Sequence, residues 1–179
     1  VQRGYLPARH LLELKHKQIC CVAGPPNSKL ADDTFTGYRN AMTEYKVDQN
    51  DFMFEIAREH TIEEGQHIGV RILTQVPRPS AVFACDDRLA MGVAKAAHLL
   101  GFRLPDELSL IGGGNLSIGK IISPELTSTP SYPEKSAELA IAKLLNQLRN
   151  PNYIKSKTVL EIENISIGGS TKSFRPHQS

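Results

Sequence analysis

The stretch RPSAVFACDDRLAMGVAKAAHLLGFRLPDELSLIG, residues 78–112, contains the pattern that decides the fold. Two short apolar runs, 81–85 and 108–112, flank a longer segment whose apolar residues recur at helical spacing. Short continuous apolar runs predict buried strands, and strands that alternate with helices are typical of a parallel sheet. Acidic residues begin the helical segment and a glycine ends it, as helix termini favour. The stretch therefore predicts a strand–helix–strand unit.

The same alternation extends to both ends of the chain. Thr61 is followed three residues later by Glu64, which predicts a capped helix start. Further strands are expected at 19–23, 52–57, 126–130 and 159–167, and further helices at 6–16, 31–45, 61–75 and 132–150. The sequence therefore predicts an α/β fold, a mostly parallel sheet with helices on both faces.

Composition limits the classes of protein to which the chain belongs. Its 179 residues carry 21 Lys and Arg against 19 Asp and Glu, a net charge of +2 that does not indicate a nucleic-acid-binding surface. No apolar run reaches the length of about 20 residues that a membrane helix needs. The first residues lack the apolar core of a signal peptide, so we expect a cytoplasmic protein.

The cysteines and histidines do not indicate a metal or a cofactor. Cys20, Cys21 and Cys85 are odd in number and lie in apolar runs, which predicts buried free thiols in a reducing compartment. No cysteine or histidine pair has the spacing of metal ligands.

The order of the motifs resembles the lactose-repressor-like (LacI/GalR) bacterial transcription regulators, whose effector-binding core has the type I periplasmic-binding-protein fold. The resemblance covers about Ala8 to Thr171, and residues 78–112 are its most specific part. The other matching motifs are ARHLLELKHKQICCVAGPPNS (8–28), TGYRNAM (36–42), PELTSTPSYPEKSAELAIAKLL (124–145) and ISIGGSTKS (165–173).

The resemblance implies two lobes, of which the first is incomplete in this chain. Residues 23–125 and 159–172 correspond to the second lobe, 1–22 and 126–158 to remnants of the first, and 173–179 to a tail. Family members also have an amino-terminal helix-turn-helix that binds DNA, and these 179 residues contain no such signature. We therefore expect an effector-binding and dimerisation core that controls DNA binding through a segment absent from this chain.

In this fold a small molecule binds between the lobes, at the carboxyl ends of the strands. The family position of a ligand-stacking aromatic residue falls near His60, which is equally well explained as a surface residue before the Thr61 cap. The family Asn-Asp pair becomes Asp86 and Asp87. Either carboxylate is a candidate acceptor for a polyol, although acidic residues at a helix start are also expected as caps.

Three further family positions depart from the usual pattern. Thr34 stands where many members have a ligand-binding arginine. Gly113 and Gly114 stand where an aromatic residue and an acceptor aspartate are usual, and Asn115 follows them. With the arginine and the aspartate both replaced, we expect a larger and more neutral effector pocket that includes Thr34, Gly114 and Asn115.

Two other functions are weighed against the regulator core. A soluble periplasmic sugar-binding protein of a transport system would share the fold but requires export. A nucleotide-using enzyme would use the glycines after residue 111 as a phosphate loop, but Gly112, Gly114 and Ser117 do not fit G-x-G-x-x-G. The histidines form neither an HExxH motif nor a triad order, and we therefore expect no enzymatic activity.

The helix expected at 132–150 has more apolar residues than one core-facing stripe requires. They are Leu139, Ile141, Ala142, Leu144, Leu145 and Leu148. Core packing and a homodimer surface both explain this pattern, and the family resemblance favours the dimer.

Overall fold

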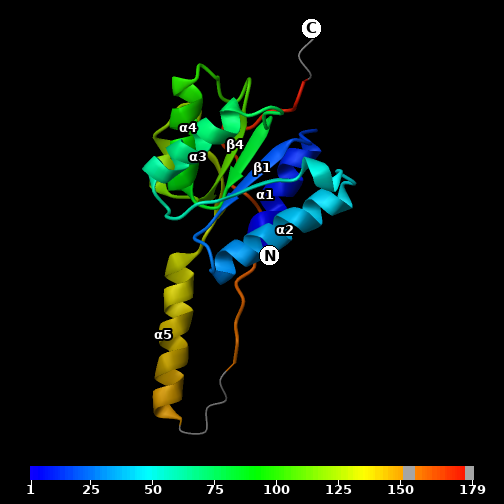
Figure 1. Cartoon of the computed structure of the whole chain (residues 1–179). Coiled ribbons are helices and arrows are strands. Elements are labelled where there is room, and N and C mark those ends of the chain that lie inside the picture. The colour runs from blue at the N-terminus through cyan, green and yellow to red at the C-terminus, as the bar shows by residue number, and fades with distance from the viewer. Residues whose placement is uncertain (151–155, 176–179) are drawn as a thin grey trace.

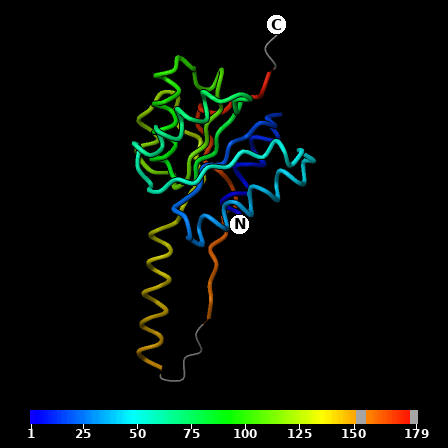
Figure 2. Tube along the Cα trace, in the orientation of Figure 1, coloured from blue at the N-terminus to red at the C-terminus, as the bar shows by residue number. Residues whose placement is uncertain are grey.

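The computed structural model describes residues 1–150 and 156–175, and Figures 1 and 2 show their arrangement. Helices and strands alternate along most of the chain. In chain order they are α1 (Gln2–Glu13), β1 (Ile19–Ala23), α2 (Lys29–Glu44), η1 (Gln49–Asp51), β2 (Met53–Ile56), α3 (Ile62–Thr74), β3 (Ala81–Ala84), α4 (Asp87–Leu99), β4 (Ser109–Gly114), η2 (Ser117–Lys120), β5 (Thr127–Pro130) and α5 (Pro133–Arg149).

The five strands form one parallel sheet in the order β2-β1-β3-β4-β5. Helices α3 and α4 pack together on one face, and α1 and α2 pack together on the other. This parallel sheet with helices on both faces confirms the predicted fold class. Because its strands are buried on both faces, β1 and β3 are continuous apolar runs.

Each face of the sheet has its own hydrophobic core. Val22, Val82 and Leu110 point toward α3 and α4, whereas Cys21, Phe83 and Ile111 point toward α1 and α2. Residues that alternate along a strand project to opposite faces, so each strand supplies both cores. The Tyr38 hydroxyl donates to the Ile19 carbonyl oxygen at 2.8 Å, which ties α2 to the sheet.

Two element boundaries differ from those predicted. Helix α1 begins at Gln2, four residues earlier than expected, and contains Pro7. No strand is assigned within 159–167; its pairing is one antiparallel bridge between Ser166 and Ser128. This prediction was wrong because the segment runs beside the edge strand β5 but pairs with it only through this one bridge.

The predicted division into lobes crosses the sheet. Residues 1–22 contain α1 and most of β1, which pack with α2 and β3, so this part of the expected first lobe is continuous with the second. Helix α5 differs, because it projects from the sheet and has no buried residue. It lies beside the segment that begins at residue 156 and runs back to the sheet (Figure 1). Lys143 Nζ donates to the Ser156 carbonyl at 2.6 Å between the two. The expected tail, 173–179, is described as far as Arg175.

Candidate functional site

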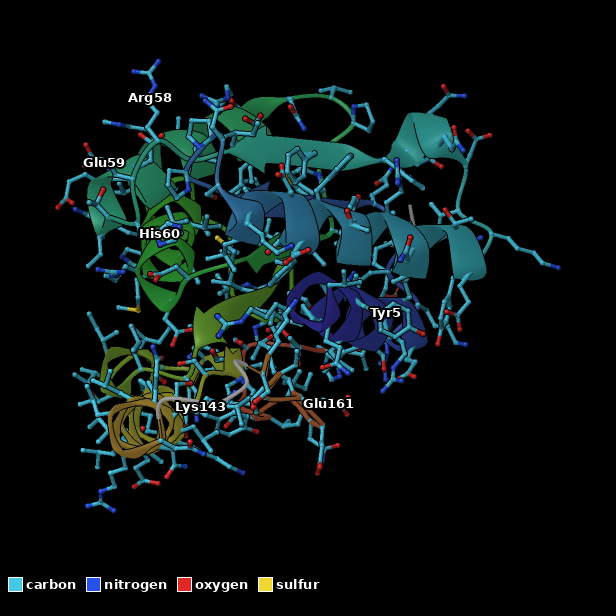
Figure 3. All side chains as sticks on the ribbon, turned by 90° about the horizontal axis from the view of Figure 1, so that it is seen from below. Tyr5, Arg58, Glu59, His60, Lys143 and Glu161 are labelled. Carbon is cyan, nitrogen blue, oxygen red and sulfur yellow. The ribbon has the colours of Figure 1, made fainter. Side chains whose placement is uncertain are left out.

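The carboxyl ends of the strands define the candidate site, because the segments that follow β1 to β4 leave the sheet at this edge. Gly24 follows β1, His60 follows β2, Asp86 follows β3 and Asn115 follows β4. In a parallel sheet these segments converge without any need for closeness in sequence. Figure 3 views the molecule from the side on which α5 projects and labels His60.

His60 connects three of these segments. Its Nε2 lies 2.8 Å from the Gly24 carbonyl oxygen, which accepts only, so this nitrogen is the donor. Its Nδ1 lies 3.6 Å from Asp86 Oδ2, and the Cys85 sulfur lies 3.7 Å from Nε2. In Figure 3 the neighbouring Arg58 and Glu59 extend outward while His60 lies against the ribbon. The structure therefore brings together His60 and Asp86, two of the predicted site residues.

Asp86 is the N-cap of α4. Its Oδ1 accepts from the Arg88 backbone N–H at 2.9 Å, and its two oxygens also accept from the Arg88 guanidinium, each at 2.9 Å. The Asp86 side chain is only 13% exposed. The capping explanation for this residue is thus present in the structure, and its charge is already paired.

Asp87 points into the protein and is fully buried. One oxygen accepts from the Ser128 hydroxyl at 2.6 Å, and the other accepts from the Leu116 N–H at 2.5 Å. Burial raises the pKa of this carboxyl, and the bonds from Ser128 and Leu116 oppose that shift. Asp87 therefore fastens α4 to β5 and to the segment after β4, and it presents no atom to a ligand.

Thr34 lies in the core between α1 and α2, also fully buried. The two helices approach so closely that a Cβ on Gly4 would lie 1.9 Å from the Thr34 carbonyl oxygen. The Thr34 hydroxyl has no hydrogen-bond partner among the described residues. A side chain enclosed in this way offers no contact to an effector.

The glycines after Ile111 belong to β4 itself. A Cβ on Gly113 would lie 2.3 Å from the Cys85 carbonyl oxygen, so no side chain fits there. Gly114 has a φ of +115°, which side chains rarely adopt. Asn115, with a φ of +52°, donates its backbone N–H to Ser128 Oγ at 3.0 Å and leaves its side chain exposed. These glycines form the end of a strand and not a phosphate loop at a helix start.

A hollow of about 10 Å³ at this edge, the space of one water molecule or one oxygen atom of a ligand, is lined in part by residues that sequence reasoning missed. It is lined by Gly113 and Gly114 together with Arg3, Phe83, Cys85 and Thr129. Arg3 comes from the first turn of α1, and only the packing of α1 on the sheet brings it here. The absence of charge at Thr34 and Gly114 led to the expectation of a neutral pocket. This expectation needs correction, because the guanidinium group of Arg3 brings a positive charge to the hollow.

The cysteines are buried or half-buried free thiols. Burial raises the pKa of Cys20 to about 12, and burial together with the Asp86 charge raises the pKa of Cys85 to about 11. Cys85 is thus a protonated thiol beside His60 and not a thiolate. Within residues 1–150 and 156–175, no group of three His, Cys, Asp or Glu side chains could hold a metal ion. No helix of that part of the chain is long and apolar enough to cross a membrane.

A larger hollow lies elsewhere, beside α4. This α4 groove has a volume of about 510 Å³ and contains none of the predicted site residues. Its lining is mostly apolar and comprises Met91, Ala94, Lys95, His98, Phe102, Arg103, Leu104, Ile122, Ser123 and Pro124.

Comparison with known proteins adds family information to this geometry. The model of the periplasmic binding protein-like domain matches residues 8–171. The ribose operon repressor of Haemophilus influenzae is 33% identical over 159 residues, which cover 88% of this chain and 47% of the repressor. The chain thus spans about half the length of this relative.

Solved structures agree on the fold. A LacI family transcriptional regulator from Enterococcus faecium with bound ribose superposes with a TM-score of 0.89 at 23% identity, covering 96% of this chain and 63% of the other. The lac repressor dimer bound to operator superposes with a TM-score of 0.85 at 21% identity, covering 94% of this chain and 57% of the other.

Proposed function

The chain belongs to the periplasmic-binding-protein-like family and is similar to the effector-binding region of LacI-type regulators, and we propose that it senses a small polar metabolite for such a regulator. Effector binding at the carboxyl edge shifts the regulator between states that differ in DNA affinity, typically through a coupling of about 1 to 3 kcal/mol. DNA is bound by a segment outside these 179 residues. No catalytic step belongs to this proposal.

The observation that carries the proposal is the difference between the two ends of the parallel strands, which we call the amino edge and the carboxyl edge of the sheet. The amino edge is crossed by residues 170–174: the Leu110 N–H donates to the Ser170 carbonyl at 2.8 Å, and the Phe174 N–H donates to the Leu14 carbonyl at 2.8 Å. The carboxyl edge instead presents His60, the exposed Asn115 and a hollow over two glycines. Polar groups that converge on an open edge suit a small ligand.

The known proteins favour a regulator over a binding protein for transport. The Haemophilus influenzae relative is named as an operon repressor, and the two superposed structures are named as a transcriptional regulator and a repressor. Ribose, which is bound in the Enterococcus faecium structure, is a reasonable first candidate for the effector class.

A thermal-shift screen with sugars, polyols, nucleosides and purines tests the proposal. A ligand present at one hundred times its Kd stabilises the folded state by about 2.7 kcal/mol, so a true effector raises Tm clearly. Asn115→Ala and His60→Gln should reduce the shift. Ser173→Ala, at the opposite edge, is the matched control and should leave it unchanged. If the hits respond equally to all three variants, the carboxyl edge is not the binding surface.

We propose further that the chain forms a homodimer, as the lac repressor does in the operator complex. Two apolar surfaces support this: the α4 groove and the α5 face, the latter formed by Ile141, Leu144, Leu145 and Leu148, which are 59%, 56%, 44% and 72% exposed. Sedimentation of Met91→Glu and Leu145→Glu assigns the contact to one surface. A wild-type chain that stays monomeric at all concentrations contradicts the dimer.

A further inference from the structure

The carboxylates near the candidate site are already neutralised or buried. Asp86 pairs with the Arg88 guanidinium through both oxygens at 2.9 Å, and His60 Nδ1 faces it at 3.6 Å. Asp87 is fully buried, and its two oxygens accept from the Ser128 hydroxyl and the Leu116 N–H. Gly113 and Gly114 add no charge. The hollow over β4 is therefore lined by no free carboxylate.

Arg3 is the cation of this hollow. It is exposed, and among the described residues its side chain makes no hydrogen bond and no ion pair. It also lies in the first turn of α1, where the helix dipole disfavours positive charge and where no acidic residue is present. Within residues 1–150 and 156–175 no ion pair compensates the Arg3 charge, so it contributes a positive potential at the hollow.

Thr129 is a second, independent feature of this hollow. It lies on β5 in register with Gly113, lines the same hollow and is only 3% exposed. Its hydroxyl has no hydrogen-bond partner among the described residues. Leaving a buried hydroxyl unpaired usually costs about 1 to 3 kcal/mol, so this donor is available to a ligand atom.

Together these residues form an anion-binding arrangement. A guanidinium and a hydroxyl both donate hydrogen bonds to carboxylate or phosphate oxygens. Gly113 and Gly114 carry no side chain, so β4 places no carboxylate beside the guanidinium and the hydroxyl that would repel an anion. A neutral sugar would leave the Arg3 charge unpaired.

We infer that the effector carries an anionic group, a carboxylate or a phosphate, which Arg3 and Thr129 bind over Gly113 and Gly114. This inference rests on the proposed function, because it names the chemical class of the molecule that the same site binds.

Calorimetric titration of the chain with ribose, ribonate, ribose 5-phosphate and inorganic phosphate tests it. The first three probes share a sugar skeleton and differ in charge, so they separate a carboxylate from a phosphate requirement. We expect one of the two anionic sugars to bind about tenfold more tightly than ribose, as a charge-assisted bidentate contact allows, and the preference to weaken with added salt. Inorganic phosphate should compete with that sugar.

Three variants locate the contact. Arg3→Gln should abolish the preference, so that the anionic sugar binds no more tightly to this variant than ribose does. Thr129→Val should lower the affinity for the anionic sugar several-fold. Arg9→Gln, on the same helix beside Glu13, is the matched control and should behave as the wild type. Because Arg3 is exposed and unpaired, its replacement should not lower the ligand-free Tm, which separates lost binding from lost folding.

The outcomes are distinct. Equal affinity for ribose and its anionic analogues, or a preference that survives in Arg3→Gln, overturns the inference and leaves the proposed function standing. If none of the probes binds and the wider screen is also blank, the inference falls together with the proposed function.

Discussion

At the residue scale, Thr34 and Thr129 are two buried threonines whose hydroxyl groups have no partner among the described residues. They differ in their surroundings: Thr34 is enclosed between two helices, whereas Thr129 borders the hollow beside Arg3. The unpaired hydroxyl therefore has a different consequence in each residue. In Thr34 it lowers stability and has no binding role, whereas in Thr129 it is a hydrogen-bond donor available to the effector.

Thr34→Val should stabilise the chain. Replacing an unpaired buried hydroxyl by a methyl group removes its desolvation cost, and we expect the free energy of unfolding to rise by about 1 kcal/mol. Effector affinity should not change. Urea unfolding measures the first quantity, and calorimetric titration measures the second.

Thr127→Val is the control for that substitution. Thr127 Oγ1 accepts from the Gly168 N–H at 3.0 Å and lies 3.3 Å from Thr171 Oγ1, so its loss should destabilise the chain by about 1 to 2 kcal/mol. A weaker effector affinity in Thr34→Val would show that Thr34 takes part in effector binding after all.

Asp87→Asn should weaken the junction of α4, β5 and the segment after β4. The amide supplies one acceptor in place of two, so either the Ser128 hydroxyl or the Leu116 N–H loses its partner. We expect a loss of about 2 to 3 kcal/mol in urea unfolding. Asp106→Asn, which breaks an exposed ion pair with Lys172, should leave stability unchanged. Equal effects of the two substitutions would contradict the role assigned to Asp87.

The candidate site was only partly predictable from sequence. His60 and Asp86 follow neighbouring apolar runs, so their convergence follows from a parallel sheet. Nothing in the sequence near Asp87 distinguishes a ligand-facing carboxylate from a buried one, because both begin a helix. Arg3 could not be found, since its place depends on how α1 packs on the sheet.

At the scale of elements, α5 is the exception to the layered packing. It has no buried residue, whereas α1 to α4 each bury one face against the sheet. The apolar residues of α5, which predicted either core packing or a dimer surface, are thus not part of the core formed by the described residues. Its apolar face is available for a contact between molecules.

Shortening an apolar side chain of α5 should therefore lower the free energy of unfolding of the monomeric chain very little. Leu144 is 56% exposed and Leu110 is fully buried in the core beneath α4. We expect Leu144→Ala to change the free energy of unfolding by less than about 0.5 kcal/mol and Leu110→Ala to lower it by about 2 to 5 kcal/mol. Chemical denaturation at a concentration where the chain is monomeric measures both. Similar losses would show that α5 packs within its own chain.

Two histidines attach the carboxyl-terminal segment and should make stability depend on pH. His10 Nε2 lies 3.2 Å from Thr171 Oγ1, and His16 Nε2 donates to the Lys172 carbonyl at 2.9 Å. Burial lowers the pKa of both histidines below the usual 6.5. As pH falls below 6.5, the unfolded chain binds protons that the folded chain does not, so the free energy of unfolding falls until the lowered pKa values are reached.

The expected slope is up to about 1.4 kcal/mol per pH unit for each histidine. Denaturation between pH 5 and 8, a range chosen around the titration of histidine, measures it. His16→Gln should reduce the slope, and the exposed His67→Gln should not. A wild-type slope of zero in this range would contradict the role of the two side chains.

Elements were more predictable than their ends. All five strands of the sheet and all five long helices follow from apolar periodicity and cap residues; Thr61 Oγ1 indeed accepts from the Glu64 N–H at 3.2 Å. The reciprocal bond of the expected capping box differs, because Glu64 Oε1 accepts from the Arg58 N–H. The strand expected at 159–167 is not formed, because apolar periodicity does not reveal whether the backbone of a segment pairs with its neighbour; here only Ser166 bridges to Ser128 of β5.

At the scale of the whole molecule, one sheet with α1 to α4 packed on its faces contains most of the described residues. The amino and carboxyl edges of this sheet differ. The amino edge is crossed by residues 170–174, and the carboxyl edge is open. We propose that the effector binds at the carboxyl edge.

Chemical-shift mapping of backbone amides tests this claim most directly, with the anionic sugar or the strongest hit of the screen as the probe. We expect the largest shifts at residues 3, 60, 113–115 and 129, and we expect Arg3→Gln to reduce them. Shifts that gather at the amino edge, around His16, Ser80 and Lys172, or in the α4 groove would contradict it.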